Sequence, residues 1–127
     1  MPGHQLPQPT DGQLEVLRVL WDNGPSTVKQ VHEAVNKKKA VGYTTTLKVM
    51  QVMHEKGLLL RNDSKYRHIY THALPAEKTQ GQLLTEFLDK AFSGSAEKLV
   101  MQLISAKKLS AKEQSRIKAL FDKIERK

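Results

Sequence analysis

Two helical periodicities followed directly by a strand periodicity limit what this chain can fold into. Apolar residues recur at three- and four-residue spacing over residues 28–37 and again over 44–57, with Gly42 between the two stretches. This spacing predicts two short amphipathic helices joined by a tight connection. Residues 58–61 and 68–72 are then short extended runs, so we expect a β-hairpin immediately after the second of these helices.

A further helix is predicted before this segment, and turn residues separate the two extended runs. Thr10 opens a stretch whose apolar residues recur at helical spacing up to Trp21, and Asn23-Gly24-Pro25 ends it. Asn62-Asp63-Ser64 is rich in turn residues, which places Lys65 and Arg67 near the tip of the hairpin. Capping-box signatures begin at Thr10, Thr27 and Ser110, and each predicts a helix start.

The order of helix, helix, helix and hairpin is that of a winged helix-turn-helix domain. Three further helical stripes follow Pro75 within about fifty residues. We therefore expect a mostly α (α+β) fold in three parts. These parts are a flexible arm at residues 1–9, a winged-helix DNA-binding domain at 10–74 and a helical dimerisation domain at 75–127.

The helix expected at residues 44–57 has one apolar side and one polar side. At 100° per residue the apolar side carries Thr46, Val49, Met50 and Met53. The opposite side carries hydroxyls, an amide and charges, from Thr44, Thr45, Lys48, Gln51 and Glu55. A helix that enters the major groove needs such short polar side chains outward. We expect Thr44 both to cap this helix and to face the groove.

The charge balance of the chain favours a polyanionic partner. The formal net charge is +8 at pH 7, and such a balance is typical of nucleic-acid-binding proteins. The run Lys37, Lys38 and Lys39 stands just before the reading helix, where it can contact the DNA backbone, and Lys65 and Arg67 can do so from the wing. The alternative for the lysine run is a solvated loop. The partner expected is double-stranded DNA, with no small-molecule substrate.

Several other chemistries are excluded or disfavoured by the residues present. The chain has no cysteine, so disulfides, thiolate metal sites and cysteine nucleophiles are excluded. His68, Tyr70 and His72 share one strand face; a half-buried packing role is favoured over metal binding, since no acidic cluster stands nearby. No nucleophile–base pair or glycine-rich phosphate loop is apparent, so we expect neither an enzyme nor a cofactor. The sequence has no signal peptide or membrane-spanning run, which makes the cytoplasm the expected location.

The apolar residues of the last fifty positions indicate a second copy of the chain as partner. Hydrophobic residues make up 39% of the chain and aromatic residues 6%, and a short three-helix tail cannot bury its large apolar side chains alone. The alternative is a tail that folds back on its own winged domain. The residues expected to form the dimer are Leu84, Phe87, Leu88, Phe92, Leu99, Val100, Leu103, Ile104, Ile117, Leu120, Phe121 and Ile124.

Four stretches of the sequence resemble one known family. PTDGQLEVLRVLWDNGPSTVKQVHEAVN, GYTTTLKVMQVMHEKGLL, RHIYTHAL and FSGSAEKLVMQLISAKKLSAKE together resemble the penicillinase and methicillin-resistance repressors, the BlaI and MecI group with their copper-responsive CopY relatives. The resemblance implies a homodimeric winged-helix repressor that binds an inverted-repeat operator of antibiotic-response genes, such as those for β-lactamases. It also implies a membrane sensor protease in the same pathway, and inactivation by cleavage in the C-terminal region.

The residues that match the family's motif also show departures from it. Tyr43 and Thr45 match, and Thr45 corresponds to a groove-facing threonine of the family. Lys48 stands where a second threonine is common, and Val52 stands where the family has an arginine that contacts DNA. The family's scissile Asn–Phe pair would fall at Gln102–Leu103, which does not match it. The copper-binding cysteines of the CopY relatives are absent, which argues against copper sensing.

A winged-helix module that docks a protein partner is the alternative function. Its third helix would need an exposed apolar face, whereas Thr44, Lys48, Gln51 and Glu55 are polar. The sequence therefore favours groove binding by Tyr43, Thr44, Thr45, Lys48, Gln51 and Val52 over protein docking.

Overall fold

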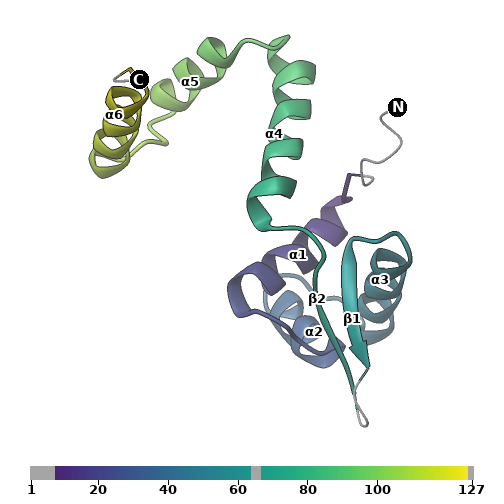
Figure 1. Ribbon diagram of the computed structural model, residues 1–127. Helices are drawn as coiled ribbons and strands as arrows, with labels where there is room; N and C mark the ends of the chain where they lie inside the picture. Colours follow the sequence, from purple (N-terminus) through teal and green to yellow (C-terminus); the bar gives the residue numbers. More distant parts are fainter. Residues whose placement is uncertain (1–7, 64–66, 126–127) are drawn as a thin grey trace, which may run out of the picture. The chain divides into compact units, whose positions relative to one another are not determined.

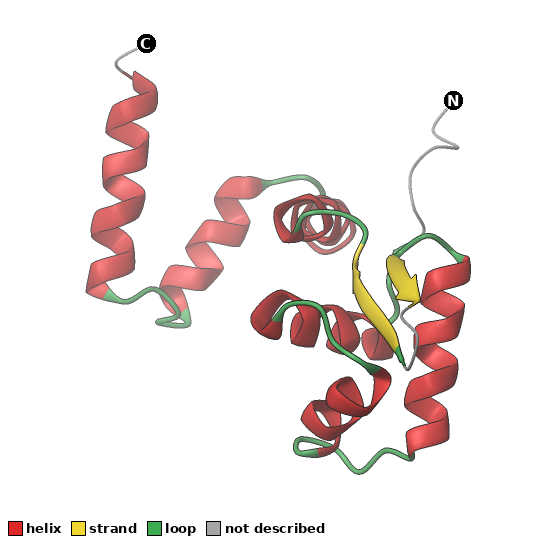
Figure 2. Cartoon of the chain, turned by 60° about the horizontal axis from the view of Figure 1, so that its bottom comes forward, coloured by secondary structure: helices red, strands yellow, loops and turns green. Residues whose placement is uncertain are grey.

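The described part of the chain folds into six helices and one antiparallel hairpin. The computed structural model describes residues 8–63 and 67–125; most of the predicted arm, and Lys65, lie outside them. The elements are α1 (Asp11–Asn23), α2 (Val28–Asn36), α3 (Tyr43–Glu55), β1 (Leu59–Asp63), β2 (His68–His72), α4 (Ala76–Phe92), α5 (Ala96–Ser105) and α6 (Ala111–Glu125). Figure 1 shows this order, and Figure 2 shows α1 to α3 gathered beside the hairpin. The fold is mostly helical, as predicted.

The three predicted capping boxes are present. In each, the first backbone N–H donates to the side-chain oxygen of the fourth residue, whose own N–H donates to the first side chain. The pairs are Thr10 with Gln13 (3.0 and 3.3 Å), Thr27 with Gln30 (2.9 and 3.2 Å) and Ser110 with Glu113 (3.0 and 3.1 Å). These local bonds fix where α1, α2 and α6 begin.

Two local expectations were wrong. Thr44 does not cap α3, because the helix already begins at Tyr43 with Gly42 as N-cap and no side-chain cap bond. Asn62 and Asp63 are not turn residues: they extend β1, with Asn62 opposite Ile69 and Asp63 opposite His68. Two turn formers are held in the strand because the pairing with β2 continues through them.

Tyr70 joins the hairpin to the helices. Its backbone pairs with Arg61 on β1 and, on its other side, exchanges two hydrogen bonds of 2.9 and 2.8 Å with Ser26 in the α1–α2 connection. Its ring is 1% exposed. The packing role predicted for this strand face is confirmed for Tyr70, and the hairpin is fixed against α1 and α2.

The hydrophobic core lies among α1, α2, α3 and the hairpin. Its buried residues are Val16, Leu17, Leu20, Val28, Val31, Val35, Met50, Met53, Leu58, Leu59 and Tyr70. The apolar side predicted for α3 is confirmed, since Thr46, Met50 and Met53 are buried and Val49 is half-buried. The opposite side of α3 therefore faces solvent.

The chain divides into two compact units, Met1–Leu83 and Leu84–Lys127. The first unit includes the start of α4, where Thr79 is buried. In the second unit no described residue is buried. The division of function at residues 74 and 75 stays a proposal. In the described part of the chain, no helix is both long and apolar enough to span a membrane.

Candidate nucleic-acid interface

The outward face of α3 carries the predicted reading residues. Thr44, Thr45, Lys48 and Gln51 are all exposed on it. Tyr43 and Val52 are exposed as well, at 47% and 37%. The face therefore offers hydroxyl, ammonium and amide groups, flanked by one aromatic ring and one aliphatic side chain. Such side chains can donate to base edges and contact thymine methyl groups.

A hollow of about 470 Å³ lies between α3, the start of α2 and the hairpin. We call it the wing groove. It is lined by Thr27, Val28, Lys29, Tyr43, Leu47, Gln51, Arg61, Arg67, His68 and Tyr70. Two predicted reading residues, Tyr43 and Gln51, thus line the same hollow as the predicted wing contact Arg67. None of these lining residues is acidic, so the groove attracts anions.

The first turn of α2 adds to this positive character. Thr27 caps the helix, and its hydroxyl accepts from the Gln30 backbone N–H. The N–H groups of a helix's first turn carry a partial positive charge. Thr27, Val28 and Lys29 line the groove, so a helix N-terminus and a lysine stand at the same place. This combination suits a phosphate group.

Asp63 contacts two side chains that line the groove, Arg61 and His68. Its Oδ1 atom lies 2.7 Å from Arg61 Nε and 2.6 Å from His68 Nδ1, and its Oδ2 accepts from Arg61 Nη2 at 3.4 Å. Desolvation acts to raise the pKa of the Asp63 carboxyl, but the His68 hydrogen bond and the Arg61 charge together outweigh it and lower that pKa. The pKa of Arg61 is raised, first by its hydrogen bond with Tyr70 and also by Asp63, against desolvation.

His32 on α2 contacts the start of α3. Its ring lies edge-to-face with Tyr43, with 5.6 Å between ring centroids, and its Nδ1 lies 3.4 Å from Thr46 Oγ1. These contacts hold Tyr43 at the end of α3 that lies next to the wing groove.

The structure does not bring the lysine run into the wing groove. Lys37 is the C-cap of α2. Lys38 lines a separate hollow with Glu15, Arg18 and Asp22 of α1. Lys39 lines a third, mostly apolar one with Thr45. All three lysines are exposed, so they remain candidates for backbone contacts from another side of α3.

Lys29, Arg61 and His68 are groove residues that the sequence reasoning did not select. Lys29 follows the Thr27 cap by two residues, so its place in the first turn of a helix was readable. The position of Arg61 was not, because its neighbours in the groove come from α2 and α3. Only the packing of the hairpin on the helices shows that these side chains share one hollow.

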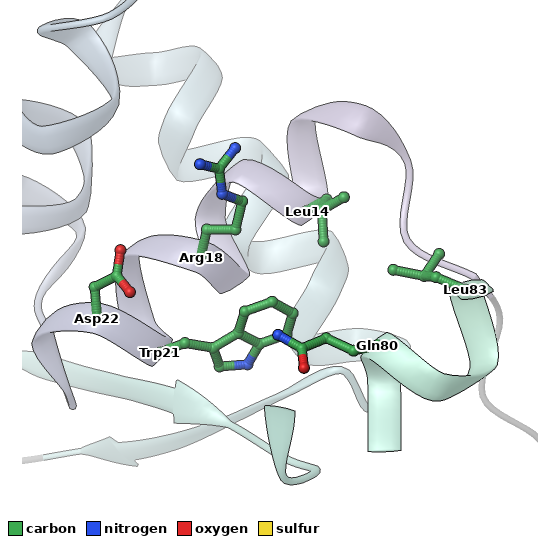
Figure 3. Close-up of a pocket in the computed structure, with 6 residues that line it drawn as sticks. All are labelled: Leu14, Arg18, Trp21, Asp22, Gln80 and Leu83. Atoms are coloured by element: carbon green, nitrogen blue, oxygen red, sulfur yellow. The ribbon is translucent and has the colours of Figure 1, made fainter. Parts of the chain in front are cut away.

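A further hollow of about 400 Å³ is lined by residues of α1 and of the start of α4. Figure 3 shows the Gln80 side chain pointing from α4 toward the Trp21 ring, with Leu14 and Leu83 also lining the hollow. Thr79 at the start of α4 is buried, and Gln80 and Leu83 of α4 share this hollow with Leu14 and Trp21 of α1.

The predicted dimerisation residues form exposed apolar faces. Nine of them are 36% to 67% exposed: Leu84, Phe87, Val100, Leu103, Ile104, Ile117, Leu120, Phe121 and Ile124. Leu88, Phe92 and Leu99 are half-buried. The Phe87 and Phe92 rings lie edge-to-face, with 5.8 Å between ring centroids. Met101, which was not selected from the sequence, is 58% exposed on α5. Large apolar side chains exposed in such number are typical of an interface.

Comparisons with known proteins agree with this architecture. The profile of the penicillinase repressor family matches residues 9–123. The transcriptional regulator BlaI of Mycobacterium tuberculosis is 32% identical over 98 residues, which make up 73% of this chain and 70% of that protein. The solution structure of monomeric Bacillus licheniformis BlaI, in complex with the blaP half-operator, matches with a TM-score of 0.51 and 22% identity. The matched region makes up 57% of this chain and 89% of that chain. This likeness shows the winged-helix fold.

Proposed function

The chain belongs to the penicillinase repressor family, and we propose that it represses transcription as a homodimer bound to an inverted-repeat operator. The observation that carries this proposal is the exposed polar face of α3 beside a groove lined with cationic side chains. A relative of the same fold, Bacillus licheniformis BlaI, was solved on a half-operator. Its DNA complex supports the same mode of binding here.

In this proposal the outward face of α3 lies in the major groove. Thr44, Thr45, Lys48 and Gln51 contact base edges, with Tyr43 and Val52 at their sides. Lys48 supplies a point charge one turn before Val52, at which the family has an arginine. These two departures from the family give the chain an operator preference of its own.

The DNA backbone is proposed to run through the wing groove. Lys29, Arg61 and the N-terminal turn of α2 then contact phosphates on one side of α3, and Arg67 and Lys65 do so from the wing. Lys37, Lys38 and Lys39 contact the backbone beyond the opposite side. Cations on both sides of a reading helix fix its register without reading sequence.

The second unit is proposed to form the dimer. Its exposed apolar faces are covered by the same faces of a second copy, since a two-fold interface is self-complementary. Two copies then present two reading helices to successive half-sites about one DNA turn, or a multiple of it, apart. We infer that the chain has no catalytic activity and acts in the cytoplasm, where the promoter lies. The family's membrane sensor protease is the proposed upstream partner.

Binding to selected and random DNA tests the proposal. Duplexes are selected from a random library with the full-length protein, and affinities are then measured over a series of salt concentrations. Gln51→Ala should change the preferred sequence and cost about 1–3 kcal/mol on the selected duplex. Lys29→Ala should weaken binding to all duplexes alike and lower the salt slope by about one unit. Lys38→Ala should do the same from the other side of α3.

Lys112→Ala on α6 is the matched control, because it removes the same charge outside the first unit. It should leave both the preference and the salt slope unchanged. A wild-type protein that selects no sequence, or a Gln51→Ala variant with the wild-type preference, contradicts the reading role of α3.

A further inference from the structure

The wing carries an anion at the place where the proposed function needs cations. Asp63 and His68 form the last described pair of the β1–β2 ladder before the turn. The Asp63 carboxylate lies within 2.7 Å of both Arg61 Nε and His68 Nδ1. Arg61 and His68 line the wing groove, whereas Asp63 itself is not among its lining residues.

The contacts of Asp63 resemble those that a phosphate would make. Arg61 meets the carboxylate with two nitrogen atoms, Nε to Oδ1 and Nη2 to Oδ2. A guanidinium binds carboxylate and phosphate oxygens with this same pair of parallel donors. An Arg61 guanidinium that faces Asp63 in this way cannot present the same two donors to DNA.

The pair is exposed enough to be exchanged. The Asp63 side chain is 54% exposed, His68 is 55% and Arg61 is 30%. Ion pairs in such positions are weak because water and salt screen them. A phosphate that arrives in the groove can therefore displace Asp63 from Arg61, at a modest cost in affinity.

We propose that Asp63 is an internal counter-ion that competes with the DNA backbone for Arg61 and His68, and so limits affinity for duplex DNA of any sequence. The inference rests on the proposed function. It assigns Asp63 a role opposite to that of its neighbours: the groove cations hold the backbone, and Asp63 shortens the time for which they hold it. Sequence preference is untouched, because Asp63 lies on the wing and off the reading face of α3.

The test removes the carboxylate and keeps the shape. Asp63→Asn in the full-length protein should bind both the selected duplex and a random duplex about three- to tenfold more tightly. The change removes the weak ion pair that occupies Arg61 and the repulsion between Asp63 and the DNA phosphates. The ratio of the two affinities should stay at its wild-type value. Asp63→Ser, which also lacks the carboxylate, should behave alike and guards against an effect specific to asparagine.

Two comparisons tie the gain to the groove cations. In an Arg61→Gln/His68→Gln background, Asp63→Asn should change affinity less than twofold, because the two side chains for which Asp63 competes are gone. Asp122→Asn, the same change on exposed α6, should leave the wild-type affinity unchanged.

The outcomes separate this inference from the function on which it rests. If the wild-type protein binds DNA but both Asp63 variants bind equally well or more weakly, the competition is overturned and Asp63 instead orients Arg61. A gain of the same size in the Arg61→Gln/His68→Gln background overturns it too. If the wild-type protein selects no sequence and binds no duplex at moderate salt, the proposed function fails first.

Discussion

The two units of this chain bury their apolar residues in opposite ways. In the unit up to Leu83, eleven hydrophobic residues, Tyr70 among them, are buried in one core. In the unit from Leu84 on, no described residue is buried, although ten large hydrophobic side chains are exposed there. The helical periodicity of the sequence is equally clear in both units.

The difference teaches that amphipathic helices need a partner surface, and that the partner need not belong to the same chain. α1, α2 and α3 cover one another and the hairpin, so the first unit has its own core. α5 and α6 leave their apolar faces open, so their stability has to come from elsewhere. Stability should therefore be independent of protein concentration in the first unit and dependent on it in the second.

The largest expected effect is a cavity in the core of the first unit. Leu20 is 1% exposed, and Leu20→Ala should lower the free energy of unfolding by about 2–5 kcal/mol. Urea denaturation followed by Trp21 fluorescence measures it, with the same loss expected at every protein concentration. Leu60→Ala is the control, because Leu60 is 56% exposed on β1; it should cost less than about 0.5 kcal/mol.

A charge on the apolar face of α6 should break the proposed dimer. Phe121 is 60% exposed, and Phe121→Asp should give a monomer by light scattering and lower operator affinity about a hundredfold, since two linked half-sites are lost. Unfolding of the first unit should not change. Ser115→Asp adds the same charge to the opposite side of α6 and should stay dimeric. A dimeric Phe121→Asp protein would contradict the claim that the apolar face of α6 forms the dimer.

The helix caps allow a smaller and more direct comparison of the two units. Thr27→Ala removes the box that starts α2 and should cost about 1 kcal/mol at any protein concentration. Ser110→Ala removes the equivalent box before α6. Its cost should appear only at concentrations at which the dimer forms. Equal, concentration-independent losses would show that the second unit folds by itself.

The smallest expected effect concerns pH and the wing. The pKa of Asp63 is lowered in the folded chain, so its stabilising contribution is present above its unfolded pKa and is lost as pH falls through the folded one. The small difference in melting temperature between wild type and Asp63→Asn should thus be fully present at pH 6 and decrease as the pH falls below 3.8, the ordinary pKa of the group. Asp122→Asn, with the same change in net charge, is the reference. A difference that grows as the pH falls would contradict this assignment.

Local chemistry made much of the fold predictable. The capping boxes at Thr10, Thr27 and Ser110, the inward side of α3 and the existence of the hairpin were all readable, because each depends on residues close together in sequence. The prediction failed where a distant partner overrode a local preference. Asn62 and Asp63 are turn formers, but pairing with Ile69 and His68 keeps them in β1.

The candidate site divides in the same way. The reading face of α3 follows from helical geometry alone, so Thr44, Lys48 and Gln51 could be selected in advance. The wing groove could not, because Lys29, Gln51 and Arg61 come from three elements. Within the lysine run, which was selected from the sequence, Lys38 and Lys39 line other hollows.

The sequence by itself determined the helices, the hairpin, the polar face of α3 and the family, since periodicity, caps and motifs are written in neighbouring residues. Only the tertiary structure decided which basic side chains share a groove and that Asp63 contacts two of its lining residues, Arg61 and His68. Such neighbours are set by the packing of α2, α3 and the hairpin around Tyr70, and the energy of that packing comes from residues far apart along the chain.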